Sequence, residues 1–244
     1  NAMDSAGGYH GSLVGDPNWV AGIVGPSSIE LRGTEGAIVI LDQNYPISGQ
    51  QLTVSAWVWA DAKPTWASIL KNWSDSMGGM VHLGLDGSGH NLDVQVTQAS
   101  GVQVSVTEGA LFPTGQWQHV AAVADGSKVR LYRNGAEVGA VDYDGTLRVE
   151  IPYISIGYKT GDDGLPSQQA PGFWNGKIDD VQIYNYGLSP ENIAQLYYDV
   201  SRLAPCLYPP ANDLNGDCLV NLADLALIAA EWLECGRYPA AGCN

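Results

Sequence analysis

Asp and Asn side chains stand at five positions of the twelve-residue stretch 213–224. The calcium loop of an EF-hand supplies oxygen ligands from positions 1, 3, 5, 7, 9 and 12, and position 7 contributes a backbone carbonyl. Counted from the first Asp of the stretch, the residues at those positions are Asp213, Asn215, Asp217, Leu219, Asn221 and Asp224. Because calcium is a hard cation that prefers oxygen, we expect this loop to bind Ca2+.

Two positions depart from the EF-hand pattern. Cys218 stands at position 6, where a glycine is expected, and Asp224 replaces the longer bidentate Glu of position 12. Neither change removes a ligand, so calcium binding stays the preferred interpretation. The alternative is a metal-free turn, in which short Asp and Asn side chains bond to the nearby backbone.

A helix is expected to follow the loop and to hold its last ligand. The apolar residues at spacing i, i+3, i+4 and i+7 are Leu225, Ile228, Ala229 and Trp232. This spacing places them on one face of an α-helix, with Asp224 in its first turn. The unit from Asp213 to Leu233 resembles a dockerin repeat, a small bacterial calcium module. The resemblance implies a protein partner, although dockerins that bind cohesin carry two such units and this chain has one.

All four cysteines lie near the C-terminus. They are Cys206, Cys218, Cys235 and Cys243. Segments too small to build a core are commonly held by disulfides, so we expect two disulfides and an extracellular, secreted protein. The three possible pairings stay open. A zinc site is the alternative, but the sequence has no C-x-x-C pair and the calcium loop lies among the cysteines.

The charge balance excludes several partners. The formal net charge is -15, and no run of Lys and Arg occurs, which argues against nucleic acid and anionic membranes. No apolar run approaches the roughly 20 residues of a membrane-spanning helix. Asn1-Ala2-Met3 resembles a remnant of tag cleavage, so we expect a natural signal peptide to precede this sequence.

Residues 27 to 184 consist of short strand-like runs separated by Gly, Asp and Pro, which is typical of an all-β sandwich. The predicted strands are 28–32, 37–41, 52–60, 68–72, 80–85, 92–97, 102–107, 117–124, 128–133, 138–143, 153–158 and 176–184. Asp125-Gly126 and Asn134-Gly135 predict tight turns between neighbouring strands.

A helix and a connector follow the last predicted strand. Ser189 as N-cap and Pro190 in the first turn predict the start of a helix over residues 191–200. The proline-containing segment 201–211 is typical of a semi-rigid connector. We therefore expect two domains, a sandwich over residues 1–200 and a tail over residues 201–244.

Four motifs occur in order along the first domain. They are Leu52–Val58, Gly115–Ala121, Val129–Gly135 and Phe173–Tyr184. Together they resemble the laminin-G-like branch of the concanavalin A-like lectin/glucanase superfamily. The resemblance implies a jelly roll, so the expected fold class is all-β, a two-sheet antiparallel sandwich followed by a small calcium loop-helix domain.

The same family commonly holds a structural calcium ion between an N-terminal Asp and an Asp pair near the last strand. In this sequence the resemblance implies Asp4 with the carbonyl of His10, and Asp179 or Asp180. Such an ion would tie together terminal segments that otherwise fray. Turns made by Asp side chains beside glycines are the alternative.

Catalysis is not expected. Glucanases of this fold carry an E-x-D-x-x-E array, because glycoside hydrolysis needs two carboxyl groups about 5 to 9.5 Å apart. The sequence has no such array, and Asp142 and Asp144 stand beside a turn glycine. His119 has no Ser or Cys motif to accompany it, so we interpret it as a packed strand residue.

Carbohydrate binding is the predicted function. Sugars offer apolar C–H faces between hydroxyls, so lectin sites combine aromatic rings with amide or carboxylate side chains. The candidate contacts are Trp66, Asn72, Trp73, Tyr158, Asp162 and Asp163. A structural role is the alternative for each of them. The first hypothesis is thus a secreted bacterial carbohydrate-binding module; a protein-interaction module and a glycoside hydrolase are the rivals.

Overall fold

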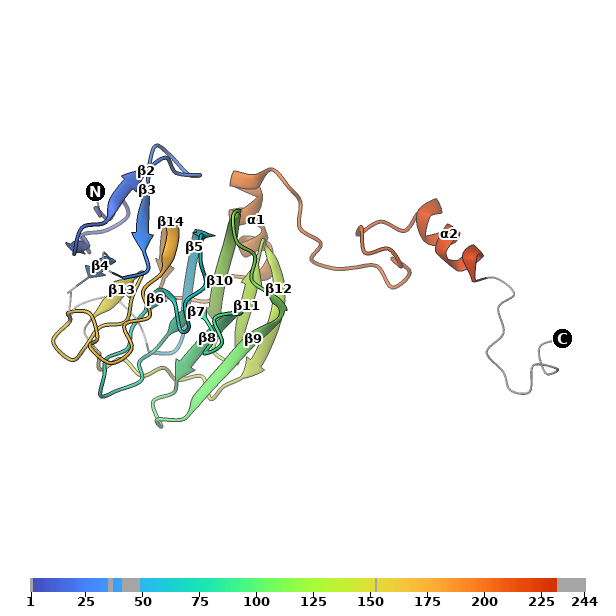
Figure 1. Cartoon of the computed structure of the whole chain (residues 1–244). Coiled ribbons are helices and arrows are strands. Elements are labelled where there is room, and N and C mark those ends of the chain that lie inside the picture. The colour runs from blue at the N-terminus through green and yellow to red at the C-terminus, as the bar shows by residue number, and fades with distance from the viewer. Residues whose placement is uncertain (1, 35–36, 41–48, 152, 232–244) are drawn as a thin grey trace. The chain divides into compact units, whose positions relative to one another are not determined.

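The computed structural model describes residues 2–34, 37–40, 49–151 and 153–231. The chain divides into two compact units, Asn1–Pro205 and Cys206–Asn244 (Figure 1). Within the described part of the chain, no helix is long and apolar enough to cross a membrane.

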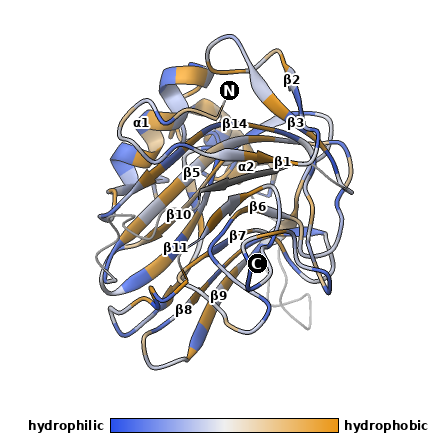
Figure 2. Cartoon of the chain, turned by 90° about the vertical axis from the view of Figure 1, so that its left-hand side faces the viewer, coloured by the Kyte–Doolittle hydropathy of each residue, from blue (hydrophilic) through white to orange (hydrophobic). Residues whose placement is uncertain are grey.

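The first unit is a sandwich of two antiparallel sheets, each of seven strands among the described residues (Figure 2). In spatial order, sheet A contains β1 (Ser12–Val14), β4 (Ala37–Ile40), β13 (Ile154–Ile156), β6 (Ser68–Lys71), β7 (His82–Leu85), β8 (Asn91–Thr97) and β9 (Gln103–Leu111). Sheet B contains β12 (Ala136–Asp142), β11 (Lys128–Arg133), β10 (Trp117–Ala124), β5 (Leu52–Ala60), β14 (Asn175–Tyr184), β3 (Ser28–Arg32) and β2 (Asn18–Val20). The predicted all-β jelly-roll sandwich is therefore confirmed.

Alternation of side chains builds the core between the sheets. On β5, Val54, Ala56 and Val58 are at most 1 % exposed and face sheet A. Leu83 of β7 and Val94 of β8 face them from sheet A, and both belong to the same cluster. Successive residues of a strand point to opposite faces, so the residues between these ones must lie on the outer faces of the sheets.

The outer face of sheet B is covered by helix α1 (Pro190–Ser201). Ala121 and Val123 of β10 form a second buried cluster with Tyr132 and with Ile193 of the helix. Burial on both faces explains why β10 reads as a nearly continuous apolar run. The predicted N-cap is confirmed, because the Ser189 hydroxyl accepts from the backbone N–H of Asn192.

His119 and Trp57 lie under the same helix. The His119 ring is 2 % exposed and lies 5.4 Å from Trp57, whose ring stacks on Tyr197 of α1. Burial lowers the pKa of His119 to about 4, so the ring is neutral. Its interpretation as a packed strand residue is confirmed. Trp117 of the same strand is half-buried and packs edge-on against Trp59.

Most predicted strands are present, and β3, β5, β10 and β11 have the predicted bounds. Asn134 and Gly135 both have positive φ, as a type I′ hairpin between β11 and β12 requires. The sequence interpretation missed β1 and β2, because three-residue strands are too short to show alternation. It also ended β9 four residues early.

The second unit contains the disulfide Cys206–Cys218 and helix α2 (Leu222–Ala230). The helix predicted after the calcium loop is thus present. Its apolar side chains are exposed: Leu222 by 80 %, Leu225 by 55 % and Ile228 by 45 %. Trp232, Cys235 and Cys243 lie outside the described residues.

Candidate functional site

A row of polar side chains crosses the outer face of sheet A. Lys71 pairs with His82, and His82 pairs with Gln95, in the registers of β6–β7 and β7–β8. Ser155 of β13 extends the row on one side and Ser105 of β9 on the other. We call these five residues the polar row. Their strand neighbours face the core, so the row points away from sheet B.

The central strands of sheet A bury the polar side chains on this outer face, although polar residues are usually exposed. Ser155 and His82 are 0 % exposed and Lys71 is 5 % exposed. Asp93 and Thr97, which lie on the same face of β8, are each 1 % exposed. Gln95 of the row is half-buried, and Ser105 on β9 is exposed. Buried polar groups require partners, so their hydrogen bonds decide what the face can do.

Two tryptophans flank the polar row. The Trp66 ring packs edge-on against His82, with centroids 6.1 Å apart, and is 40 % exposed. The Lys71 Nζ lies over the Trp73 ring, 5.0 Å from its centroid. Gly78 closes one side: a Cβ added there would lie 2.8 Å from Thr97 Oγ1 and 3.6 Å from the Trp73 ring.

Four buried polar atoms at this face have no hydrogen-bond partner. Of the seven such side-chain atoms among the described residues, these four are Trp73 Nε1, His82 Nδ1, Asp93 Oδ2 and Thr97 Oγ1. A buried unpartnered group costs about 1–3 kcal/mol. Because four such atoms lie on one face, we expect a ligand or water to form hydrogen bonds with them there.

Burial also sets the charges of the face. It lowers the pKa of His82 well below its usual range, so the ring is neutral; Nε2–H donates to the Leu85 carbonyl at 3.4 Å, which leaves Nδ1 as an acceptor. Burial, aided by repulsion from Lys159, lowers the pKa of Lys71 to about 7. Burial raises the pKa of Asp93. The face therefore offers both donors and acceptors.

Of the predicted sugar contacts, Trp66 and Trp73 lie at this face. The side chains of Asn72 and Tyr158 form hydrogen bonds within the protein instead. Asn72 Nδ2 donates to the carbonyls of Ile151 and Tyr153, and its Oδ1 accepts from the Met80 N–H. Tyr158 is 0 % exposed, and its hydroxyl donates to the Gly164 carbonyl at 3.1 Å. Both side chains are buried and hydrogen-bonded within the protein.

Asp162 bonds to a residue of another loop, and Asp163 stabilises its own turn. Asp162 Oδ1 accepts from the N–H and hydroxyl of Ser76 at 3.0 and 2.8 Å. Asp163 Oδ1 accepts from the Leu165 N–H at 2.9 Å. The Asp162 bonds tie the loop after β13 to the loop after β6, which carries Trp73. These bonds from Asp162 position the loop that carries Trp73.

The sequence interpretation missed the polar residues of the strands themselves. The stretch from Asn91 to Thr97 alternates polar and apolar residues, which signals one face turned away from the core. That signal could have singled out Asp93, Gln95 and Thr97. Nothing local marks Lys71 and His82, because only the strand register brings them beside Gln95.

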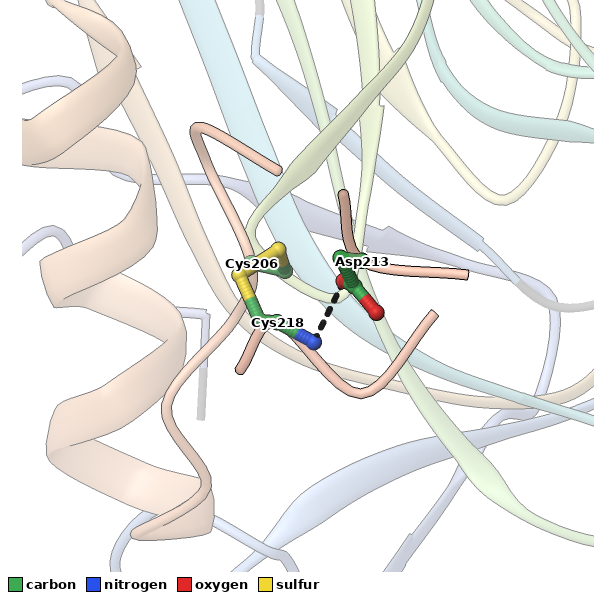
Figure 3. A group of neighbouring side chains, drawn as sticks. All are labelled: Cys206, Asp213 and Cys218. Carbon is green, nitrogen blue, oxygen red and sulfur yellow. Dashed lines mark hydrogen bonds between the residues drawn. A yellow bond between two sulfur atoms is a disulfide. The ribbon is translucent and has the colours of Figure 1, made fainter. Parts of the chain in front are cut away.

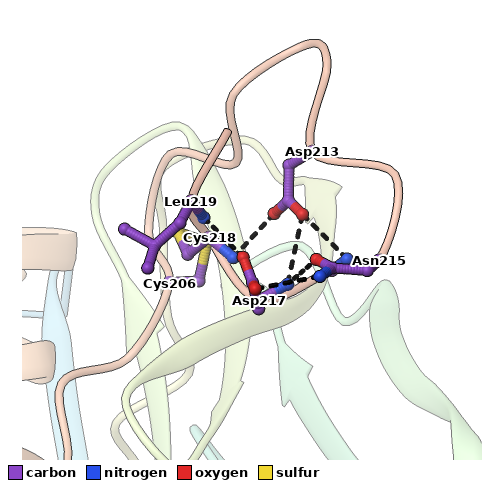
Figure 4. The surroundings of a disulfide bond; sticks show 7 residues. Cys206, Asp213, Asn215, Asp217, Cys218 and Leu219 are labelled. Carbon is purple, nitrogen blue, oxygen red and sulfur yellow. Dashed lines mark hydrogen bonds between the residues drawn. A yellow bond between two sulfur atoms is a disulfide. The ribbon is translucent and has the colours of Figure 1, made fainter. Parts of the chain in front are cut away.

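Four of the calcium-loop candidates, Asp213, Asn215, Asp217 and Leu219, lie in one compact loop of the second unit (Figure 4). Asp213 Oδ1 accepts from the N–H groups of Gly216 and Asp217, at 2.8 and 3.1 Å. Asp217 Oδ1 accepts from the Leu219 N–H, and its other oxygen accepts from the Asn215 amide. These bonds fold the backbone around the side-chain oxygens.

Asp224 closes the loop and opens helix α2. It is the one buried residue in the described part of the second unit, at 2 % exposure. Its Oδ1 accepts from the Leu214 and Asn215 N–H groups, and its Oδ2 from Asn221 as half of a capping box. The Asn221 N–H bond is the main cause of its lowered pKa. Position 12 therefore lies beside positions 2 and 3, as a closed loop requires.

The donor set suits a hard cation. Three carboxylates, two amides and one carbonyl at the six loop positions are the oxygen ligands that calcium takes. Cys206 and Cys218 also lie within 4.8 Å of the Asp213 carboxylate (Figure 3), but both sulfurs are in the disulfide and are not thiolate ligands.

Three residues of the second predicted calcium site line one cavity of about 630 Å3 in the first unit. Asp4, Asp179 and Asp180 all line it. Asp4 accepts from the N–H groups of Ala6 and Tyr9, and its own N–H donates to His10 Nδ1. Asp179 Oδ2 accepts from two backbone N–H groups at 2.8 and 2.9 Å, and its Oδ1 from Asp180. These carboxylates are engaged with backbone, so calcium at this place stays a prediction.

Solved structures of similar fold include domain 4 of AbnA, an extracellular GH43 arabinanase from Geobacillus stearothermophilus, in complex with arabinotriose. It has a TM-score of 0.65 and 22% identity, over 81% of this chain and 93% of that one. The binding domain of botulinum neurotoxin serotype G has a TM-score of 0.61 and 14% identity over 81% of this chain. The binding domain of botulinum neurotoxin DC in complex with SialylT has a TM-score of 0.58 and 15% identity. This chain covers 48% of each neurotoxin chain.

A comparison with curated proteins found no match. The model of the concanavalin A-like lectin/glucanase superfamily matches residues 32–194, which is more than half of the chain and includes strands of both sheets. The chain belongs to the concanavalin A-like lectin/glucanase superfamily.

Proposed function

We propose that this protein is a secreted, non-catalytic carbohydrate-binding module whose sandwich binds sugar at the outer face of sheet A. The observation that carries the proposal is the set of four buried, unpartnered polar atoms on that face, beside Trp66 and Trp73. A sugar hydroxyl both donates and accepts, so it can satisfy Trp73 Nε1 and His82 Nδ1 alike.

The aromatic rings supply the apolar part of the interaction. Trp66 is 40 % exposed although it packs against His82, so part of this residue is open to a ligand. The C–H face of a sugar ring can stack on such a surface, while the hydroxyls reach the polar row. The similar fold of the arabinanase domain, solved with arabinotriose, supports an oligosaccharide as the ligand.

The carboxylates of the face support binding without hydrolysis. A retaining glycosidase needs two carboxyl groups about 5–5.5 Å apart, and an inverting one about 6.5–9.5 Å. On the described strands β6 to β8, Asp93 is the one carboxylate on this face, and its Oδ1 is held by the Thr107 hydroxyl at 2.6 Å. Asp86 lies in the turn after β7 and accepts from Ser88 and His90.

The tail has a separate role in this proposal. We infer that it is a dockerin-like unit that binds calcium through the loop from Asp213 to Asp224 and docks a protein partner. The donor set of the loop supports the metal, and the exposed apolar residues Leu222, Leu225 and Ile228 support the partner. The disulfide supports an extracellular location.

The sugar site is tested by calorimetry on a glycan that a glycan array identifies. Trp66→Ala should lower affinity about tenfold, because ~1.4 kcal/mol of stacking is lost. Trp19→Ala is the matched control: Trp19 is 38 % exposed but lies on β2 of sheet B, so its loss should leave affinity unchanged. Equal affinity of both variants and the parent protein would remove the outer face of sheet A as the site.

A further inference from the structure

Lys71 has a buried amine without an ionic partner among the described residues. The ion pairs among the described residues use Lys128, Arg130, Arg133, Arg148 and Lys159. None of them involves Lys71, which is 5 % exposed and contacts the Trp73 ring. In a chain with a net charge of -15, a buried lysine left without a carboxylate needs an explanation.

The groups that face Lys71 do not neutralise it. His82 on β7 is neutral, and Ser155 on β13 donates its hydroxyl to the Lys71 and Tyr158 carbonyls. Lys159 repels the amine while its own Nζ pairs with Asp75 at 2.8 Å. Asp93 on β8 attracts Lys71 but lies beyond ion-pairing distance, and its own pKa is raised.

We propose that the outer face of sheet A binds acidic sugars, and that Lys71 Nζ donates to the carboxylate or sulfate of the sugar. The inference rests on the proposed function, since it names the class of sugar bound at that site. Trp73 Nε1, unpartnered beside Lys71, is a second donor for the same anionic group. Charge-assisted hydrogen bonds are about twice as strong as neutral ones, so this pair gives specificity as well as affinity.

An anion would satisfy Lys71 better than a hydroxyl. The buried amine has lost most of its water, and its lowered pKa records that loss. A carboxylate beside it restores the charged form, whereas a neutral hydroxyl compensates for only part of the lost hydration. Asp93 Oδ2 can then accept a hydroxyl of the same sugar ring.

The test compares matched ligands on the whole chain by calorimetry. The probes are trigalacturonate, its uncharged methyl ester and a sulfated galactan trisaccharide. We expect at least one acidic probe to bind about tenfold more tightly than the ester. Lys71→Gln should abolish that preference, so that the acidic probe and the ester bind with equal affinity. The carboxylate and sulfate probes distinguish the two anions.

The pH dependence provides a readout that needs no variant. Lys71 binds an anion in its protonated form, and its pKa is about 7 in the free protein. Affinity for the acidic sugar should therefore fall about tenfold between pH 6 and pH 8, while affinity for the ester stays constant. The pKa of His82 is lowered well below its usual range, so its ring is neutral at both pH values. A constant affinity for the ester would show that titration of Asp93 does not change sugar binding in general.

The outcomes separate the two proposals. Equal affinity for acidic and neutral sugars, with loss of both in Trp66→Ala, overturns the acidic-sugar inference and keeps sugar binding at this face. A preference that survives in Lys71→Gln overturns the role of Lys71. No binding of any sugar overturns the proposed function and the inference with it.

Discussion

Cys218 occupies a backbone conformation that favours glycine. Its φ is +67°, in the left-handed region. Gly216, two residues earlier, has φ +76°. Left-handed backbone costs a non-glycine residue roughly 1–2 kcal/mol. The Cys218 N–H donates to Asp213 Oδ2 at 2.7 Å, and the disulfide to Cys206 fixes the residue in place. The crosslink therefore supports the turn that glycine makes in an EF-hand loop.

Calcium affinity should depend on that crosslink. In Cys206→Ala/Cys218→Ala the loop must enter the left-handed conformation when calcium binds, so we expect affinity to fall about 5- to 30-fold. Cys206→Ala/Cys218→Gly also lacks the disulfide, but glycine tolerates this conformation, so most of the affinity should return. Calorimetric titration with calcium measures both. Equal weakening in the two variants would contradict a conformational role for the disulfide.

At the level of elements, sheet B and sheet A have different outer faces. Helix α1 covers sheet B with Ile193, Ala194 and Tyr197, so that face is a second core. The outer face of sheet A has the buried polar row and the two tryptophans instead. One outer face is therefore covered by an apolar helix and the other has polar groups, and the proposed sugar site depends on this difference.

This division predicts separate effects on stability and binding. Ile193→Ala should lower the free energy of unfolding by about 2–5 kcal/mol, because a fully buried side chain leaves a cavity. Sugar affinity should not change, since the side chain lies on the other sheet. Urea denaturation and calorimetry measure the two quantities, and Gln195→Ala on the exposed side of α1 is the control. A loss of sugar affinity in Ile193→Ala would show that the faces are coupled.

Local sequence patterns predicted the elements better than the site. Alternation identified β5 and β10, Asn134-Gly135 identified a hairpin, and ligand spacing identified the loop closed by Asp224. The polar row was missed because it depends on register. A bulge in β6 shifts its pairing with β7, and that shift sets Lys71 opposite His82. Such a relation joins residues of different strands and leaves no mark on either one.

On the scale of the whole molecule, the two units are stabilised in different ways. The sandwich has an extensive apolar core, and none of the chain's cysteines lies before residue 206. In the described part of the tail, the one buried residue is the carboxylate Asp224, and helix α2 exposes its apolar side chains. A segment without an apolar core depends on crosslinks or a metal for its stability. Calcium should therefore stabilise the tail far more than the sandwich.

Hydrogen exchange on the intact chain can test this difference segment by segment. Calcium at 100 times its Kd should stabilise the folded loop by about 2.7 kcal/mol and slow exchange there by about 100-fold. We expect that protection at the amides that bond to Asp213 and Asp224, including those of Leu214, Gly216 and Cys218. Exchange in β6 to β8 should respond to sugar and not to calcium. Calcium protection around Asp4 and Asp179 would instead show a metal in the first unit, and unchanged exchange in the loop would contradict calcium binding there.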